Sequence, residues 1–192
     1  AAAAGTRLIE LGRAGDAAAA LRALGAFRLL CPHRHGPYGV DRWGARVEGW
    51  LERAGALPGA VYPGLPLIVT ENDYALRLFN GDAGVIVRGP DGPVAAFERA
   101  GRPLEVAPGR LGAAEPVHAM TVHKSQGSQF TAVGVVVAPP TSAISTRELL
   151  YTAITRARER LLVVGTRDAL TAAVSRPVAR ASGLRDALWP SR

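Results

Sequence analysis

The sequence predicts an α/β fold in which a parallel sheet is covered by helices on both faces and carries a small inserted β-barrel or β-meander. Segments with helix and strand patterns alternate near both ends of the chain, as is typical of parallel sheets. Between them, about forty residues hold short apolar stretches separated by Gly-Asp, Gly-Pro and Asp-Gly turns. We therefore expect residues 1–71 and 115–192 to form two parts of the α/β domain, and residues 72–114 to form the inserted β domain.

The first predicted elements are a helix and a strand. Asp16 is a suitable N-cap for a helix over Ala17–Leu24, and Gly25 is well placed to end it. The apolar run Phe27–Cys31 follows, and Pro32 stops it. Such a run indicates a buried strand.

The next predicted elements lead into the insert. Apolar residues recur at helical spacing over Val40–Ala54, where Trp43 and Trp50 lie on one face and are expected to be core residues. Leu65–Thr70 is a strand candidate, assigned to the α/β part. The insert then offers three β-like pieces: Gly84–Val87, Val94–Phe97 and Leu104–Val106.

After Pro116 the α/β alternation returns, and the apolar run Val133–Ala138 is typical of a strand inside a parallel sheet. A tail over Ala181–Arg192 is expected to dock through its apolar residues. The predictions for this part are a strand at 117–120, a helix start near 123–126, a helix at 146–158, a strand at 161–165, a helix from Asp168, and docking through Leu184, Leu188 and Trp189.

Composition narrows the class of protein. The chain has 192 residues, 48% of them apolar, which is enough for one domain with a real core. Its formal net charge of +7 suits a polyanionic partner such as nucleic acid. Cys31 is the only cysteine, so we expect a reducing, cytoplasmic setting. No apolar run approaches the roughly 20 residues of a membrane span, and we expect no membrane contact.

The most informative segment is Met120–Phe130, which reads Met-Thr-Val-His-Lys-Ser-Gln-Gly-Ser-Gln-Phe. It places hydroxyl, cationic and amide side chains where a strand is expected to end and a helix to begin. Ligands bind at that edge of a parallel sheet, and the free N–H groups of a helix start suit a phosphate. The alternative is a polar turn in which Lys124 is simply solvated.

A second segment, Ser145–Arg158, is expected to be helical and to bury one apolar stripe. Arg156 and Arg160 share another face, because they are four residues apart. For Arg158 and Arg160 we expect surface ion pairs with a neighbouring glutamate.

Together, the His-Lys-Ser-Gln-Gly-Ser and Tyr-Thr-Ala-Ile-Thr-Arg-Ala-Arg stretches resemble motifs V and VI of the superfamily-one helicases, and most closely the RecD family. The stretch Leu30–Val40 resembles the motif IV region of that family, and Asn72–Gly84 resembles the lead into its inserted domain. The resemblance covers the chain from about Leu29 to the tail. It implies a RecA-like motor lobe, the second of two in such helicases, with an SH3-like barrel as the insert.

The resemblance also implies roles for individual residues. In these helicases ATP lies between two RecA-like lobes, and the second lobe donates an arginine to the γ-phosphate. Arginine suits that task because its charge is permanent and its donors are forked. The implied catalytic residues are Arg156 and Arg34, the implied nucleotide contacts are Gln126, Gly127, Gln129, Arg156 and Arg34, and the implied DNA contacts or coupling residues are Thr121, His123, Lys124 and Ser125. Gln129 replaces the carboxylate that the family commonly has there.

The chain has no phosphate loop of its own. Such a loop ends in Gly-Lys-Ser/Thr, and the only lysine is Lys124, which follows His123. A magnesium-binding acidic pair at a strand end is missing as well. The cofactor is expected to be ATP with Mg²⁺, whose ligands would lie on an N-terminal lobe. Because Ala1–Ala4 include no initiator methionine, we expect the chain to be part of a longer polypeptide and inactive alone.

The expected partners are the N-terminal RecA-like lobe, single-stranded or duplex-end DNA, and RecB- and RecC-type subunits. The sequences of the motif IV region and of Ala181–Leu184 are most similar to those of the family members that belong to exodeoxyribonuclease V. This similarity implies 5′ to 3′ unwinding in double-strand-break repair. Two alternatives remain: a stand-alone RecD-like or conjugative helicase, or a scaffold that binds DNA without hydrolysing ATP. Gln129 favours the scaffold, whereas Arg34 and Arg156 favour the motor.

Two other patterns are weaker. Cys31, His33 and His35 alternate at a strand end, but a closed zinc site needs four ligands. His123 lies near Ser125, yet the acidic partner of a hydrolase triad is missing. We expect no metal site in this chain.

Overall fold

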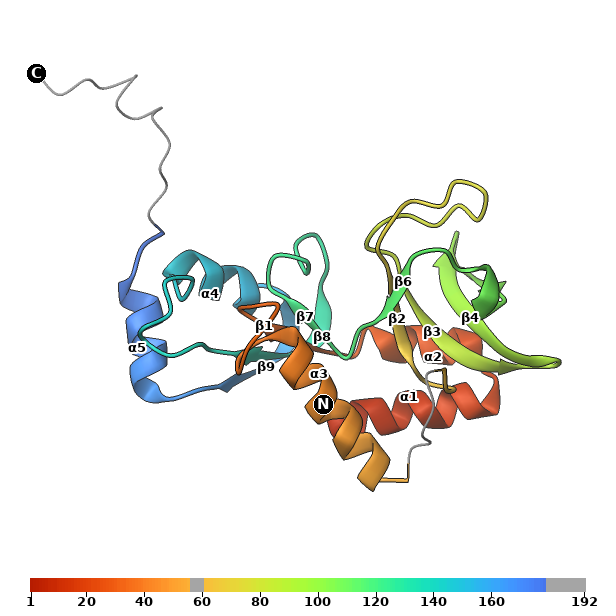
Figure 1. Ribbon diagram of the computed structural model, residues 1–192, viewed down its shortest axis with the longest axis horizontal. Coiled ribbons are helices and arrows are strands. Elements are labelled where there is room, and N and C mark those ends of the chain that lie inside the picture. Colours follow the sequence, from red (N-terminus) through yellow and green to blue (C-terminus); the bar gives the residue numbers. More distant parts are fainter. Residues whose placement is uncertain (56–60, 179–192) are drawn as a thin grey trace, which may run out of the picture.

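The computed structural model describes residues 1–55 and 61–178. Figure 1 shows two sheets side by side, with helices packed against each of them. The predicted docking of Leu184, Leu188 and Trp189 lies outside the described residues.

One sheet is parallel, as predicted. Its strands are ordered β7 (Ala119–Thr121), β1 (Phe27–Cys31), β8 (Phe130–Val136) and β9 (Ala157–Val164). In the register, Leu30 pairs with Met120 on one side and with Val135 on the other. Val135 in turn pairs with Val163. The near-continuous apolar run of β8 is therefore explained by its central position between two parallel neighbours.

Helices cover both faces of this sheet because side chains along a strand alternate between faces. On one face α3 (Val40–Arg53) packs against β1 through Val47 and Leu51. On the other, α4 (Arg147–Ile154) and α5 (Arg167–Ser175) cover β8. The edge strand β9 is less covered, and its Leu162 is 59% exposed.

The second sheet is antiparallel and open. Its order is β5 (Arg102–Val106), β4 (Gly92–Arg99), β3 (Ala83–Gly89), β2 (Pro66–Val69) and β6 (Ala114–Pro116). A short 3-10 helix, η1 (Pro108–Arg110), lies between β5 and β6. Among the described residues no pairing joins β5 to β6. Consecutive antiparallel strands β3, β4 and β5 form the meander that was one of the two predicted forms of the insert.

The strand candidate at residues 65–70 belongs to this second sheet, and its assignment to the α/β part was wrong. Pro66 pairs with Val85 of β3, and Leu67 pairs with Pro116 of β6. The two antiparallel ladders place β2 between strands of the insert. The backbone therefore passes from one sheet to the other before residue 66 and returns after residue 116.

Two helices at the start of the chain cover the antiparallel sheet (Figure 1). In α2 (Ala17–Leu24) the predicted N-cap is confirmed, because Asp16 Oδ1 accepts a hydrogen bond from Ala19 N at 2.8 Å. The helix α1 (Ala2–Ala14) was not predicted. Its Leu8 and the α2 residues Ala20 and Leu24 pack with Val85, Val87 and Ala96.

Two predicted helix boundaries were wrong. Residues 122–127 form turns and not a helix start, since Gly127 has a φ of +86° and the chain must return to β8 within a few residues. The helix expected to reach residue 158 ends at Ile154, because β9 already begins at Ala157.

Within residues 1–55 and 61–178, no helix combines the length and apolar character needed to cross a membrane. The same residues contain no group of three or more His, Cys, Asp or Glu side chains arranged to hold a metal ion.

Candidate nucleotide and DNA interface

The motif loop, residues 122–129, runs along the whole height of the parallel sheet. It begins after Thr121, which pairs with Cys31 at the carboxyl end of β1. It ends before Phe130, which pairs with Ala157 at the amino end of β9. Because α4 joins β8 to β9, it runs between the same two edges. The motif loop can therefore contact both ends of α4.

The first half of the motif loop is held by local hydrogen bonds. The Ser125 side chain is fully buried, and its hydroxyl donates to Val122 O at 2.7 Å. Lys124 N donates to Thr121 Oγ1 at 3.1 Å. His123 and Lys124 are exposed. Because its hydroxyl points into the protein, the structure does not favour a direct DNA contact by Ser125. Its alternative role in coupling the nucleotide and DNA sites stays a prediction.

A pocket of about 370 Å³ lies between the motif loop and the start of α4. His123 and Gln126 line it from the loop, and Thr146 and Glu148 line it from the helix. Thr146 caps α4 by accepting a hydrogen bond from Leu149 N at 3.3 Å. Glu148 accepts from Val178 N at 2.8 Å. The carboxylate of Glu148 disfavours a phosphate in this pocket, although Arg147 Nη2 lies 3.6 Å from Glu148 Oε1 and offsets part of that charge.

Hydrogen bonds hold Arg156 against the second half of the motif loop. Its Nη1 donates to Ser128 O at 3.1 Å, its Nε to Thr152 O at 3.1 Å, and its Nη2 to Thr155 Oγ1 at 3.1 Å. The backbone carbonyl of Arg156 accepts from Phe130 N at 2.8 Å. A guanidinium has five N–H groups, so the three bonds fix its position and leave two donors for an anion.

Gln129 contacts a neighbouring arginine. Arg158 Nε donates to Gln129 Oε1 at 3.3 Å, which leaves the amide N–H groups of Gln129 as its free polar atoms. Among the described residues, neither Arg158 nor Arg160 forms an ion pair with Glu148 or Glu159. The predicted surface ion pairs of these two arginines were wrong.

Arg34 lies at the opposite edge of the sheet from Arg156. It is exposed, and it follows β1 in a loop where His33 Nε2 and Ser142 Oγ are hydrogen-bonded at 3.0 Å. Ser142 follows the carboxyl end of β8. Arg156 precedes the amino end of β9, a strand of eight residues that spans about 25 Å. The two arginines therefore start from opposite edges of the sheet, and the predicted role of Arg34 as a second phosphate contact stays a prediction.

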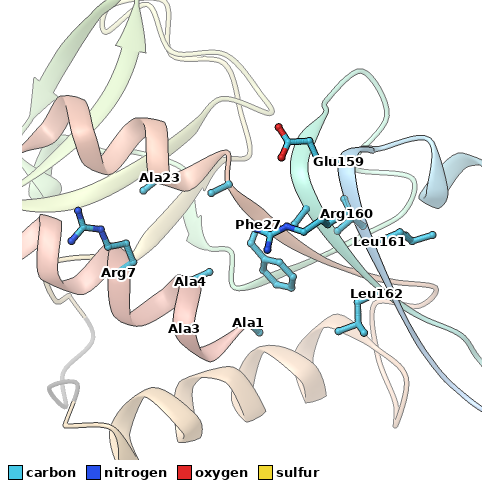
Figure 2. Close-up of a pocket in the computed structure, with 13 residues that line it drawn as sticks. Ala1, Ala3, Ala4, Arg7, Ala23, Phe27, Glu159, Arg160, Leu161 and Leu162 are labelled. Carbon is cyan, nitrogen blue, oxygen red and sulfur yellow. The ribbon is translucent and has the colours of Figure 1, made fainter.

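A separate cavity of about 790 Å³ lies between the start of α1 and the edge strand β9 (Figure 2). Arg7, Phe27, Leu161 and Leu162 are among its lining residues. None of the predicted site residues lines it. Its walls combine apolar side chains with Arg7, Arg160 and Glu159, and we assign no nucleotide to it because it lies apart from the motif residues.

A polar cluster around the buried side chain of His118, at the junction of the two sheets, was missed by sequence reasoning. The Tyr62 hydroxyl and His118 Nε2 are hydrogen-bonded at 2.8 Å, and Glu48 lies 3.7 Å from the same nitrogen. Burial, and secondarily the charge of Arg28, lowers the pKa of His118 to about 4. The ring is therefore neutral at neutral pH and forms no ion pair with Glu48. The available signal was Arg28 itself, a cation within an apolar strand.

Comparison with known proteins supports the resemblance that the motif sequences indicate. The profile of the UvrD-like helicase C-terminal domain matches residues 116–164. The RecBCD enzyme subunit RecD of Mycobacterium tuberculosis (strain CDC 1551 / Oshkosh) is 51% identical over 93% of this chain and 32% of its own length. With the profile match, this makes the chain similar to the C-terminal part of RecD. The RecD subunit of Mycolicibacterium smegmatis is 48% identical over 96% of this chain and 33% of its own length.

More distant relatives share less of the chain. The ATP-dependent RecD2 DNA helicase of Deinococcus radiodurans is 31% identical over 79% of this chain and 22% of its own length. The chain thus spans about a third or less of the RecD-type relatives named here. A solved Pif1 helicase from Bacteroides, in complex with ADP-AlF3 and ssDNA, has a TM-score of 0.51 and 15% identity over 96% of this chain and 52% of its own. This likeness shows a helicase-like fold.

Proposed function

We propose that this chain is the C-terminal motor lobe of an ATP-dependent DNA helicase of the RecD type. The observation that carries the proposal is the fixed position of the Arg156 guanidinium. Three hydrogen bonds hold it beside the motif loop, and two of its N–H groups stay available for an anion. An arginine held in this way is preorganised to stabilise negative charge on a transferring phosphoryl group. The likeness to RecD sequences over most of the chain supports the same role.

The chain supplies half of the ATP site. It contains no Gly-Lys-Ser/Thr sequence, so the phosphate loop and the ligands of Mg²⁺ would come from an N-terminal RecA-like lobe. ATP with Mg²⁺ would bind between the lobes, where Arg156 reaches the γ-phosphate. Gln126 and Gly127 would lie near the nucleotide, and the amide of Gln129 would donate to a ribose hydroxyl.

The exposed side chains of the motif loop would contact DNA. His123 and Lys124 are solvent-accessible and can approach a phosphate, while Thr121 and Ser125 would shape the turn that presents them. Arg34 has a permanent charge and, among the described residues, no hydrogen-bond or ion-pair partner for its side chain. Because it lies at the opposite edge from Arg156, we do not assign it to the γ-phosphate.

The proposed partners are single-stranded and duplex-end DNA, together with RecB- and RecC-type subunits in a cytoplasmic exodeoxyribonuclease V. The names of the RecD relatives support this assignment. The proposed activity is 5′ to 3′ unwinding during double-strand-break repair and recombination. The insert would be a small SH3-like unit of the motor, a proposal that its five-stranded antiparallel sheet supports.

The test is ATP hydrolysis by the full-length protein that carries both lobes. Arg156→Ala should lower single-strand-stimulated kcat by a factor of about 10³ or more, while ATP binding changes far less, because the arginine acts on charge that develops in the transition state. Arg160→Ala removes an exposed arginine of β9, four residues further along the chain, and should leave kcat within about threefold. An unchanged kcat in Arg156→Ala would contradict the proposal.

The second candidate is a scaffold that binds DNA without hydrolysis. The observation in its favour is Gln129, whose oxygen is engaged by Arg158 at a position where the RecD family commonly has a carboxylate. A full-length wild-type protein that binds single-stranded DNA but shows no stimulated hydrolysis would support this candidate.

A further inference from the structure

The junction of the two sheets contains a buried cation that the proposed function does not use. Arg28 lies in the central strand β1 and is only 4% exposed. No described carboxylate forms an ion pair with it, and its Nε has no hydrogen-bond partner. Burying a charge without a counterion disfavours folding. The fold alone therefore gives no reason for an arginine here.

One contact of Arg28 is to the connection between the sheets. Its Nη1 donates to Val117 O at 2.7 Å. Val117 is one of two residues between β6 of the antiparallel sheet and β7 of the parallel sheet. Val117 N donates to Pro66 O of β2 at 2.9 Å. The two backbone groups of Val117 thus bind one sheet each, and Arg28 is the partner on the motor side.

The other contact of Arg28 is to the residue that holds Arg156. The guanidinium carbon lies 5.2 Å from the centroid of the Phe130 ring, within the range of a cation–π contact. Phe130 N donates to Arg156 O at 2.8 Å. Two residues earlier, Ser128 O accepts from Arg156 Nη1 at 3.1 Å. One buried side chain therefore links Val117 to the backbone that fixes Arg156.

We propose that Arg28 is a positioning residue that couples the junction between the antiparallel and parallel sheets to Arg156. This inference rests on the proposed role of Arg156. When Val117 moves with the antiparallel sheet, the guanidinium moves with its hydrogen-bond acceptor, and Phe130 follows through the ring contact. A displacement of about 1 Å at a catalytic group is enough to slow a reaction strongly.

The first test separates positioning from folding in the full-length protein. Arg28→Met replaces the arginine by an unbranched apolar side chain of similar length and removes the charge. We expect kcat for DNA-stimulated hydrolysis to fall about tenfold or more, with KM for ATP within about threefold and a melting temperature within about 5 °C of wild type. Arg28→Lys keeps a cation over the ring and should restore part of kcat.

Arg46→Met is the matched control, because it also removes an arginine over an aromatic ring. The guanidinium carbon of Arg46 lies 4.9 Å from the centroid of the Trp43 ring, and the pair is far from Arg156 in the chain. Its kcat should equal that of wild type. If Arg28→Met does not fold, Phe130→Leu takes its place, since it removes the ring contact and keeps an apolar core side chain. The same fall in kcat is then expected.

A second test needs no ATP. The amide of Phe130 donates to Arg156 O, so its hydrogen exchange in the full-length protein reports on the link directly. Exchange at Phe130 should be faster in Arg28→Met than in wild type or Arg46→Met. This inference alone would be overturned if a folded Arg28→Met protein showed the wild-type kcat and the wild-type exchange at Phe130 while Arg156→Ala was impaired. An unimpaired Arg156→Ala protein would overturn the proposed function instead.

Discussion

At the scale of single residues, the motif loop divides its polar side chains into two groups. His123 and Lys124 point to solvent, whereas Ser125 is buried and bonded to Val122 O. The sequence identifies all three as polar residues of one motif, but the tight turn closed by Gly127, with its φ of +86°, decides which of them can meet a ligand. Side-chain direction in a turn depends on backbone angles that residue type does not determine.

This division predicts different effects of two substitutions on DNA binding. Lys124→Ala should weaken binding to single-stranded DNA and reduce the slope of log affinity against log salt by about 1, because one phosphate contact is lost. Ser125→Ala should leave that slope unchanged and cost about 1 kcal/mol of folding stability through the lost hydrogen bond. Fluorescence anisotropy at several salt concentrations measures the first effect, and thermal unfolding the second. Equal salt slopes for wild type and Lys124→Ala would contradict the assignment.

The His118 ring gives the junction a pH dependence. Its folded pKa of about 4 lies below the ordinary value of 6.5, so the unfolded chain binds a proton first as the pH falls. The folding stability contributed by this group is complete above pH 6.5 and is lost progressively down to about pH 4. The groups that face the ring are Tyr62, Glu48 and Arg28.

We therefore expect the free energy of unfolding to fall by roughly 1.4 kcal/mol per pH unit between about pH 6 and pH 4.5, from this group alone. His118→Phe, which keeps a ring without a titratable nitrogen, should remove that share of the slope. Urea denaturation of both proteins across this pH range measures the difference. Identical slopes would show that His118 titrates normally in the folded chain.

At the scale of elements, local signals were sufficient for α2, β1 and α3. Asp16 and the periodic apolar residues specify α2 and α3, and the run Phe27–Cys31 specifies β1. The helix α1 was missed although Ala, Leu, Arg and Glu, which favour helices, make up most of it. Gly5 and Gly12 disfavour a helix interior, and no capping side chain marks its start. Packing on the antiparallel sheet stabilises α1, and these contacts between distant segments cannot be predicted from a local sequence pattern.

The close approach of α1 to the chain before β2 predicts opposite effects of two glycine substitutions. A Cβ on Gly12 would lie 2.3 Å from Gly64 N, whereas a Cβ on Gly44 in α3 would meet nothing within 4 Å. Gly12→Ala should destabilise the protein by more than about 2 kcal/mol through this clash. Gly44→Ala should be neutral or stabilising by up to about 1 kcal/mol. Equal melting temperatures of the two variants would contradict the close packing.

At the scale of the whole molecule, the two-part architecture was predictable, but the pairing between distant segments was not. The sequence indicates a parallel sheet and a turn-rich insert, and both are present. That Pro66–Val69 pairs with Ala114–Pro116, almost fifty residues away, follows from neither pattern. The same limit applies to Arg34 and Arg156. The motifs imply that both contact the nucleotide, and the strand order places them at opposite edges of the sheet.

The central claim is that this lobe donates Arg156 to a nucleotide held by another lobe, and a transition-state analogue tests it most directly. ADP with aluminium fluoride resembles the transferring phosphoryl group, so its affinity should depend on Arg156 while that of ADP should not. In the full-length protein bound to single-stranded DNA, Arg156→Ala should weaken the analogue by a factor of about 10² or more and ADP by less than about threefold. Equal weakening of both ligands, or of neither, would contradict the role of Arg156 in the motor.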